Sequence, residues 1–377
     1  MRIGIISRSN LDDRIYWSGL INSIYFELKS YKNVEIVKID RLDDTIRKIS
    51  ALKREYLKYF KKIKYDESYN EIVAKNFAKQ IELKLEKKKI DFLITFDSSL
   101  IAFLNTNIPI ILWTDLLYSD YYDHYFHRRN ISKETKKSIK KIEKKAISNC
   151  YKVILSTKWA LNKAKEKYEK MFYKFHLLHF GPSLRKSIPS SEINKFISKR
   201  SKKKLSLITL SVNWERKGLD KLIKLNKLII QKGIKSQLTI IGIKNKIIKD
   251  KNIKIINFIN KNEEYGEEKI SKNLTKNHFH LLFSNSEAYG ISLIEANSRG
   301  LPNISFKVGG ISQIVKKNVS GKLFDINENM ELIASYIIKI FKNNKRYKKL
   351  CKSSYKEYRN NFSYEKIIPK LINILKK

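Results

Sequence analysis

The sequence predicts an α/β protein built from two domains, each with a parallel β-sheet covered by helices on both faces. The chain has 377 residues, a length that favours two domains over one. Short apolar runs alternate with longer helical stretches, and this series occurs twice along the chain. Between the two series, residues 183–204 are rich in Ser, Lys and Pro and poor in apolar side chains, which is typical of a linker.

The first series occupies residues 1–182, which we expect to form the N-terminal domain. Apolar runs predict buried strands at residues 3–6, 34–39, 91–96, 109–113 and 152–156. Helices are expected at residues 20–28, within the densely charged stretch 44–90, and at residues 133–149, where Ser132 is the expected N-cap. The alternation of strands and helices indicates a parallel sheet covered on both faces.

The second series occupies residues 205–355 and predicts a C-terminal domain of the same kind. Strands are expected at residues 205–210, 238–242, 254–258, 280–283 and 303–306. Helices are expected at residues 217–232 and 290–299, and a long polar helical tail begins at about residue 330. Open sheets of this kind bind ligands beyond the carboxyl ends of their strands, so a cleft between two such domains is the expected site.

The composition restricts the function classes. The formal charge is +42 from 79 basic and 37 acidic residues, which suits an anionic partner or reflects a genome biased toward Lys, Ile and Asn codons. We see neither the Arg clusters nor the modules of a sequence-specific nucleic-acid reader. We expect no signal peptide, because the apolar run at residues 3–6 is too short for one. No apolar run is long enough to span a membrane, and Cys150 and Cys351 have no metal or redox spacing. These features predict a cytoplasmic protein.

Residues 286–302 carry the most informative pattern, which reads as strand, loop, helix, turn and strand. Glu287 lies in the loop, and Gly290 allows the backbone to pass close to a ligand. The N–H groups of Gly290, Ile291 and Ser292 open the helix, where unpaired donors suit a diphosphate. Glu295 lies about one turn inside the helix, where its carboxylate can accept both hydroxyls of a ribose. The alternative is a plain amphipathic helix with two solvated glutamates.

This segment resembles the E-x7-E motif of the retaining family 4 glycosyltransferases, which belong to glycosyl transferases group 1. The matching residues are Glu287, Tyr289, Gly290, Glu295, Ala296, Gly300, Leu301 and Pro302. The following residues 308–315 and 318–324 resemble the family's GG turn with its helix and the family's next hairpin. The resemblance implies the GT-B fold, with two Rossmann-like domains facing each other across a cleft. It also implies that residues 356–377 form a C-terminal helix that crosses back to the first domain.

A second match lies upstream, where residues 214–220 follow a strand and open a helix. They resemble the family's KG segment, whose Lys contacts the donor diphosphate, and here that position is Lys217. Arg216 and Lys217 can stabilise charge on the leaving phosphate in place of a metal ion. The family often has a further Arg at a position that is Ser211 or Val212 here, so Arg216 is the candidate substitute. The alternative for both cations is ordinary surface charge.

The N-terminal half matches the family less specifically. Gly19, in the run Trp17-Ser18-Gly19, corresponds to a glycine loop that faces the diphosphate, although Ser18 as a helix cap is an equal alternative. Asp115 follows a strand where many members have a catalytic-side His, and we expect it to contact sugar or acceptor unless it is a helix N-cap. Tyr118, Tyr121, Tyr122 and Tyr125 suit an acceptor platform or, alternatively, buried packing.

The resemblance implies sugar transfer from a UDP- or GDP-sugar to a glycan or lipid-linked acceptor, with retention at the anomeric carbon. The commonest setting is cell-surface polysaccharide synthesis. The implied roles are Glu287 for the sugar hydroxyls, Glu295 for the ribose, and Lys217 with Arg216 for the diphosphate. We expect no cofactor and no metal. The pairs His278 with His280 and His124 with His127 are interpreted as core or surface histidines.

A basic amphipathic segment adds a membrane hypothesis. Leu52, Tyr56, Leu57, Phe60 and Ile63 recur at helical spacing among Lys and Arg residues. Such a helix can lie peripherally on an anionic membrane, here its inner face, or it can pack its stripe on the sheet.

Two other function classes remain open from the sequence. A sugar-nucleotide epimerase of similar fold would lack the motif of residues 287–302. A non-enzymatic polyanion or nucleic-acid binder is motivated by charge alone and predicts salt-sensitive binding without donor hydrolysis.

Overall fold

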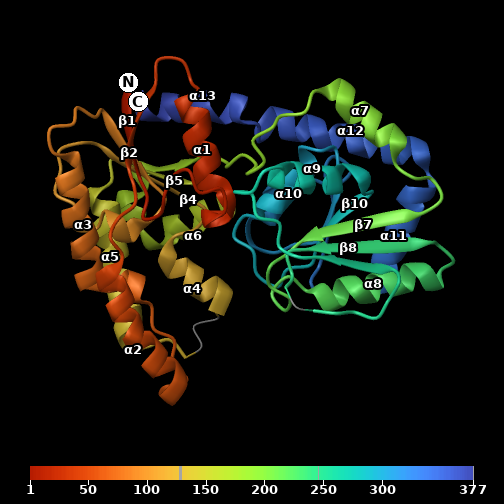
Figure 1. Ribbon diagram of the computed structural model, residues 1–377, viewed down its shortest axis with the longest axis horizontal. Coiled ribbons are helices and arrows are strands. Elements are labelled where there is room, and N and C mark those ends of the chain that lie inside the picture. The colour runs from red at the N-terminus through yellow and green to blue at the C-terminus, as the bar shows by residue number, and fades with distance from the viewer. Residues whose placement is uncertain (127–129, 245, 377) are drawn as a thin grey trace. The chain divides into compact units, whose positions relative to one another are not determined.

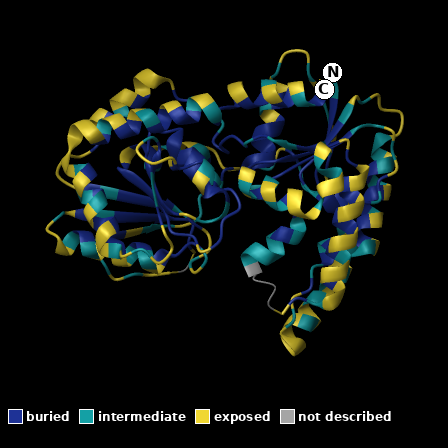
Figure 2. Ribbon diagram, turned by 180° about the vertical axis from the view of Figure 1, so that it is seen from behind, coloured by how far each residue is buried: buried dark blue, intermediate teal, exposed yellow. Residues whose placement is uncertain are grey.

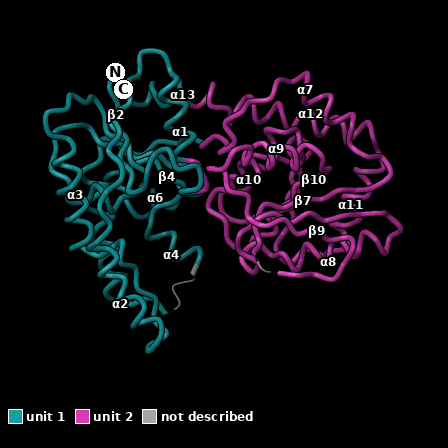
Figure 3. Tube along the Cα trace, viewed as in Figure 1, with its two compact units in different colours: residues 1–17, 21–179, 368–377 teal, residues 18–20, 180–367 magenta. Residues whose placement is uncertain are grey.

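The computed structural model describes residues 1–126, 130–244 and 246–376. The chain forms two compact units (Figure 3). Unit 1 comprises Met1–Trp17, Ile21–His179 and Ile368–Lys377, and unit 2 comprises Ser18–Leu20 and Phe180–Ile367. Among the described residues, every helix is too short or too polar to cross a bilayer.

Unit 1 contains a six-stranded sheet in the order β2-β1-β3-β4-β5-β6, and every neighbouring pair is parallel (Figure 1). Its strands are β1 (Arg2–Ile6), β2 (Glu35–Ile39), β3 (Phe92–Thr95), β4 (Ile110–Thr114), β5 (Lys152–Leu155) and β6 (Phe175–Leu177). Its α-helices are α1 (Leu20–Lys29), α2 (Thr45–Lys61), α3 (Glu71–Leu85), α4 (Tyr118–Phe126), α5 (Lys133–Asn149) and α6 (Lys158–Lys167). Short 3₁₀ turns are η1 (Tyr16–Gly19), η2 (Glu67–Tyr69), η3 (Ser98–Leu100) and η4 (Glu169–Lys174).

Unit 2 contains a second parallel six-stranded sheet, in the order β12-β11-β10-β7-β8-β9. Its strands are β7 (Leu205–Leu210), β8 (Ser236–Ile241), β9 (Ile253–Ile256), β10 (Phe279–Leu282), β11 (Asn303–Phe306) and β12 (Gly321–Phe324). Its helices are α7 (Ser190–Lys199), α8 (Leu219–Gln231), α9 (Gly266–Lys276), α10 (Ile291–Asn297), η5 (Gly309–Gln313), α11 (Met330–Lys342) and α12 (Asn344–Asn361). Helix α13 (Tyr364–Lys376) begins in unit 2 and ends in unit 1.

The two parallel sheets confirm the predicted α/β class, and several local features differ from the sequence-based expectations. The segment 183–204, expected to be a linker, contains α7, which buries Ile193 and Ile197. The polar helical tail divides into α11, α12 and α13, and the helix expected at residues 356–377 corresponds to the end of α12 and to α13. Residues 318–324 form no hairpin, because β12 pairs in parallel with β11.

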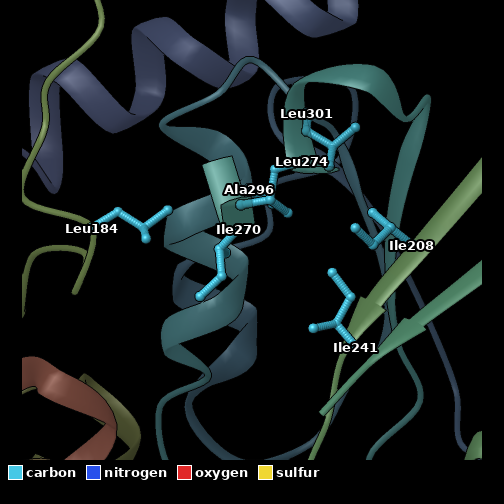
Figure 4. Packing of buried hydrophobic residues seen from close by; sticks show 7 residues of the cluster. All are labelled: Leu184, Ile208, Ile241, Ile270, Leu274, Ala296 and Leu301. Carbon is cyan, nitrogen blue, oxygen red and sulfur yellow. The ribbon is translucent and has the colours of Figure 1, made fainter. Parts of the chain in front are cut away.

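Apolar strand residues place the core of each unit around its sheet, and exposed residues concentrate on the outer faces of the helices (Figure 2). In unit 2, one buried cluster joins the strands to α9 and α10 (Figure 4). Its members are Leu184, Ile208, Ile241, Ile270, Leu274, Ala296 and Leu301. This packing fixes α10 against the sheet and thereby the position of Glu295, which precedes Ala296 in the chain.

The strand order of unit 2 reverses between β7 and β10. From β7 the chain proceeds to β8 and β9 on one side, and then to β10, β11 and β12 on the other. Open α/β sheets bind ligands outside the carboxyl ends of the strands at such a reversal of strand order. Lys217 follows β7 and Glu287 follows β10.

Candidate active site

The loops after β7 and β10 are packed directly on each other. Gly218 has φ +63°, and a Cβ at this position would lie 2.3 Å from the carbonyl oxygen of Phe283. Only glycine combines that backbone conformation with so close an approach. The N–H of Asn285 donates to the carbonyl oxygen of Arg216 at 2.9 Å. This contact holds the residues before Gly218 against the loop that carries Glu287.

The packed loops bring Arg216, Lys217 and Glu287 into one cluster. Lys217 Nζ lies 2.5 Å from Glu287 Oε2, and Arg216 Nη1 lies 3.3 Å from the same oxygen. The Ser284 hydroxyl also donates to Glu287 Oε2, at 3.1 Å. Lys217 and Glu287 are buried, whereas the Arg216 side chain is partly exposed. A buried carboxylate is stable only when it is paired and hydrogen-bonded, and here it is both.

The charges of this cluster are set by burial and pairing. Burial alone would raise the pKa of Glu287, but the charges of Lys217 and Arg216 outweigh it and hold that pKa below its ordinary value. Burial lowers the pKa of Lys217, against the opposing effect of Glu287. The Lys217 ammonium and the Glu287 carboxylate therefore stabilise each other as a buried ion pair. The site therefore holds a buried carboxylate and two cations at the switch point of the sheet.

Helix α10 begins directly after this loop. Gly290, at φ +89°, is its N-cap, and the next seven residues form the helix. The helix is buried from Ser292 to Asn297, so it is not the solvated amphipathic helix considered as the alternative. The Oγ of Ser292 is buried and has no hydrogen-bond partner among the described residues. A buried hydroxyl without a partner at the first turn of a helix is available to a ligand oxygen.

Glu295 projects from α10 into a polar cluster that the sequence did not reveal. The Ser183 hydroxyl donates to Glu295 Oε1. Lys261 Nζ lies 3.7 Å from the same carboxylate oxygen and donates to Ser183 Oγ at 2.5 Å. Neither Ser183 nor Lys261 carries a signal in the sequence, since Lys261 is one of 79 basic residues and Ser183 lies in the expected linker.

Tyr289 anchors the same loop to Phe180. Its hydroxyl donates to the carbonyl oxygen of Phe180 at 2.6 Å, and the two rings meet edge to face with centroids 5.5 Å apart. The side chain is buried, so its contribution to a ligand site is through the position of the Gly290 backbone.

The glycine loop of the N-terminal half has an unusual backbone. Trp17, Ser18 and Gly19 have φ values of +51°, +58° and +79°. Successive left-handed residues, two of them not glycine, are strained and concentrate at functional sites. Residues 18–20 group with unit 2, and the carbonyl oxygen of Ser18 accepts a hydrogen bond from Lys261 Nζ at 2.7 Å. Gly19 therefore lies near the cluster that holds Glu295.

Asp115 belongs to unit 1 and lines a cavity of about 360 Å³ at the carboxyl ends of β1, β3 and β4. The cavity combines polar and aromatic walls, formed among others by Arg8, Trp17, Asp97 and Tyr118. The structure thus gathers Arg216, Lys217, Glu287, Tyr289, Gly290, Ile291, Ser292 and Glu295 within unit 2, while Asp115 lies in a separate cavity of unit 1.

Two of the tyrosines after Asp115, Tyr118 and Tyr122, are anchored by one carboxylate. Tyr118 stacks on Tyr69, with centroids 3.7 Å apart, and its hydroxyl donates to Asp66. The Tyr122 hydroxyl donates to the same Asp66 oxygen at 2.7 Å. Tyr118 and Tyr121 also line the cavity of unit 1. The segment therefore has features of both alternatives, since its tyrosines pack within unit 1 and two of them face a cavity.

The histidines of unit 2 are internal to the sheet. His278 Nδ1 accepts from the Ser206 N–H at 3.0 Å, while His280 Nδ1 lies 2.8 Å from Asn303 Oδ1. Burial lowers the pKa of both imidazoles to about 4. No group of three or more His, Cys, Asp or Glu side chains suited to a metal ion occurs within the described part of the chain. His127 lies outside the described residues.

Comparison with known proteins places these residues in a recognised family segment. Residues 190–357, which include the ion pair and α10, match the family model of glycosyl transferases group 1. No curated protein sequence matches the chain significantly. The match supports the resemblance drawn from Glu287 to Pro302.

Solved structures with the same fold cover the whole chain or most of it. Sucrose-phosphate synthase from Thermosynechococcus elongatus is 13% identical with a TM-score of 0.68, and the alignment covers 100% of this chain and 98% of the other. WaaG, a glycosyltransferase involved in lipopolysaccharide biosynthesis, is 14% identical with a TM-score of 0.66, over 100% and 99% of the two chains. TarM is 17% identical with a TM-score of 0.60 over 80% of this chain, which spans only 58% of TarM. At these identities the likeness concerns the fold, which is GT-B as the resemblance implied.

Proposed function

We propose that this chain, whose residues 190–357 match glycosyl transferases group 1, transfers a sugar from a UDP- or GDP-sugar to a glycan or glycolipid acceptor with retention. One observation carries the proposal: a buried Lys217–Glu287 ion pair, joined by Arg216, lies where the strand order of unit 2 reverses. That position suits a nucleotide, and the residues there supply both signs of charge that an activated sugar requires.

The cations are assigned to the diphosphate of the donor. Lys217 has three N–H donors, and its contact with Glu287 uses one of them. The partly exposed Arg216 adds a planar guanidinium, whose geometry matches phosphate oxygens. The unpartnered Ser292 hydroxyl is assigned to the same group. These positive charges stabilise the leaving diphosphate as the bond to the sugar breaks.

The carboxylates are assigned to the neutral parts of the donor. Glu287 is assigned to accept hydrogen bonds from hydroxyls of the transferred sugar. Lys217 and Ser284 hold its carboxylate in position for this role. Glu295 accepts from the ribose, with Lys261 and Ser183 orienting its carboxylate. Ligand hydroxyls can join these hydrogen bonds without leaving either carboxylate unpaired.

The proposed chemistry is a front-side substitution. The bond between the anomeric carbon and the diphosphate oxygen breaks, the acceptor oxygen bonds to that carbon from the same face, and the acceptor proton passes to the leaving diphosphate. Glu287 is engaged with two cations in the structure, so we assign it to positioning the sugar rather than to a covalent glycosyl intermediate of the kind retaining glycosidases form.

The acceptor is assigned to the cavity of unit 1 that Asp115 lines. The aromatic side chains of the cavity can pack against the apolar face of a sugar ring. The carboxylates of Asp97 and Asp115 can accept hydrogen bonds from sugar hydroxyls. WaaG, similar in fold, is described as acting in lipopolysaccharide biosynthesis. We extend that setting to this chain as a proposal, with a cell-surface polysaccharide or its lipid-linked precursor as the acceptor.

The test measures release of nucleoside diphosphate from UDP-, GDP- and ADP-sugars by the purified chain, with and without EDTA. We expect slow hydrolysis of one donor that persists in EDTA, since Lys217 and Arg216 serve where other enzymes use a metal ion. Glu287→Ala should lower turnover on the order of 10²-fold or more, and Glu295→Ala should mainly raise the donor KM. Glu215→Ala, an exposed carboxylate in the same loop as Lys217, is the matched control.

Three outcomes would refute the proposal. Unchanged kinetics in both glutamate variants would remove the assigned site. Absence of hydrolysis with every donor, together with salt-sensitive binding of nucleic acid, would favour the polyanion binder. Interconversion of the sugar without its release would favour an epimerase. The anomeric configuration of the product, read from NMR coupling constants, tests retention separately.

A further inference from the structure

Helix α2 presents an apolar stripe to solvent. Its apolar side chains at positions 49, 52, 56, 59 and 60 recur at intervals of three and four residues, so they lie along one face of the helix. All five are large and exposed: Ile49 by 61%, Leu52 by 71%, Tyr56 by 53%, Tyr59 by 83% and Phe60 by 75%. Single exposed apolar residues are ordinary, but a contiguous set on one helix marks an interaction surface.

The opposite face of α2 already has partners within unit 1. Arg47 and Arg54 both bind Glu67, with Nη1–Oε1 distances of 2.9 and 2.5 Å. Arg47 also pairs with Asp44, and Lys53 reaches Glu134 on α5 at 2.5 Å. Leu57 is half-buried on this side. The helix is therefore held in place by these ion pairs, and the exposed stripe does not serve to attach it.

Packing of the stripe on the sheet, one of the two alternatives left open by the sequence, does not hold for its exposed members. Leu52, Tyr56 and Phe60, which the sequence pattern grouped with Leu57 and Ile63, point away from the unit, and no residue of α2 is buried. The rings of Tyr56 and Phe60 lie 5.2 Å apart, and those of Tyr59 and Phe60 lie 6.3 Å apart. The C-terminal half of α2 thus carries an exposed aromatic cluster.

Positive charge surrounds the stripe. Helix α2 contains six basic residues and one acidic residue, which gives a formal charge of +5. Lys48 and Lys61 lie outside the stripe, are exposed, and form no ion pair among the residues that the structure describes. Lys62, also exposed, ends the helix in the left-handed conformation at φ +51°.

We propose that α2 is a docking surface for an anionic lipid bilayer, with the stripe inserted at the level of the headgroups and acyl chain ends and the lysines against lipid phosphates. An apolar face with exposed Tyr and Phe, bordered by Lys, is the composition of helices that lie in that interface. A polyanion in water would use the lysines but would leave Ile49 and Leu52 exposed. The inference does not depend on the proposed sugar transfer, because α2 carries none of the residues assigned to it.

The test is flotation of the purified chain with vesicles of phosphatidylcholine containing phosphatidylglycerol, against vesicles of phosphatidylcholine alone. The stripe variant carries Leu52→Ser, Tyr59→Ser and Phe60→Ser. Its matched control carries Ile72→Ser, Leu83→Ser and Tyr173→Ser, which replace three equally exposed apolar side chains elsewhere in unit 1. Far-ultraviolet circular dichroism and urea denaturation of each variant test whether the fold and its stability are unchanged.

A second pair of variants tests the charges. Lys48→Glu with Lys61→Glu reverses two charges on α2, and Lys349→Glu with Lys352→Glu makes the same change on α12. A lysine at an anionic membrane surface contributes a factor of about five to binding. The α2 pair should therefore weaken partition onto anionic vesicles about 20-fold or more, and the α12 pair should have less effect.

We expect the parent chain and the apolar control to float with anionic vesicles and the stripe variant to remain in solution. The inference is overturned if the parent chain ignores anionic vesicles, or if the stripe variant floats as well as its control. Binding of single-stranded RNA through the stripe without vesicle binding would identify a nucleic acid as the partner instead. A dimer that the stripe variant abolishes, again without vesicle binding, would identify a second copy of the chain.

Discussion

Removal of the Lys217 charge is the most informative single perturbation, because it leaves the buried carboxylate of Glu287 without its nearest partner. Both residues are under one tenth exposed. Breaking a buried pair by removal of one partner costs about 3–5 kcal/mol. After Lys217→Met, Glu287 Oε2 would retain Arg216 at 3.3 Å and the Ser284 hydroxyl at 3.1 Å. We therefore expect the low end of that range, about 3 kcal/mol.

The double variant Lys217→Met with Glu287→Gln separates pairing from packing. It removes both charges of the pair and leaves Arg216, which is partly exposed and hydrated. We expect the double variant to recover about 2 kcal/mol of the loss, since an uncharged amide is cheaper to bury than an unpaired carboxylate. The control is Lys232→Met, which breaks an exposed pair with Glu331 in the same unit and should cost less than about 1 kcal/mol.

The assay must report unit 2 by itself, because a chain with two compact units need not unfold in one step. Urea denaturation read by pulsed hydrogen exchange on peptides from β7 and β10 meets that need. A loss below about 1 kcal/mol for Lys217→Met would refute the reasoning. So would a double variant whose loss equals the sum of the two single losses, because the residues would then not interact.

Three further outcomes follow from local geometry. Gly218→Ala should lower the free energy of unfolding of unit 2 by about 2–3 kcal/mol in the same denaturation assay, and Gly233→Ala, also at positive φ but with open space around it, by about 1 kcal/mol. Equal losses for the two variants would contradict the close approach of Gly218 to Phe283. Burial lowers the pKa of His278 and His280 to about 4, so these imidazoles bind protons at higher pH in the unfolded chain than in the folded one, and unit 2 should lose stability as the pH falls from about 6.5 to 4. His280→Gln should flatten that decline, and an unchanged pH profile would contradict the prediction. Burial raises the pKa of the Cys150 thiol to about 12, so it should react with a disulfide reagent only after unfolding, and rapid labelling of the native chain would contradict its burial.

The sequence was sufficient for central strands such as β4, because they are short, continuous apolar runs that are buried throughout. The edge strands β6 and β12 were not predicted as strands of the sheets. Residues 205–210 and 303–306 were predicted with the bounds that the structure has for β7 and β11. It was less informative for helices such as α7 and α9, whose polar composition resembles that of a loop. In α7 the two buried isoleucines, Ile193 and Ile197, were too few to stand out.

The residues of the site were predicted separately, but not all of their contacts. Glu287 and Lys217 were recognised from two motifs about 70 residues apart in the sequence, and their ion pair arises because β7 and β10 are neighbours in the sheet. Ser183 and Lys261 were missed because a lone serine and a lone lysine have no pattern in so basic a chain. The exposure of the α2 stripe was equally hidden, since helical spacing shows that a stripe exists but not what it faces.

The central claim is that the cluster of Arg216, Lys217 and Glu287 binds the diphosphate and sugar of a nucleotide-sugar donor. A crystal structure of the chain with bound UDP or GDP tests it most directly. The account predicts phosphate oxygens within hydrogen-bond distance of Lys217 Nζ and the Arg216 guanidinium, with the ribose beside Glu295. Phosphates bound elsewhere on the chain, with these three side chains unoccupied by the nucleotide, would contradict it.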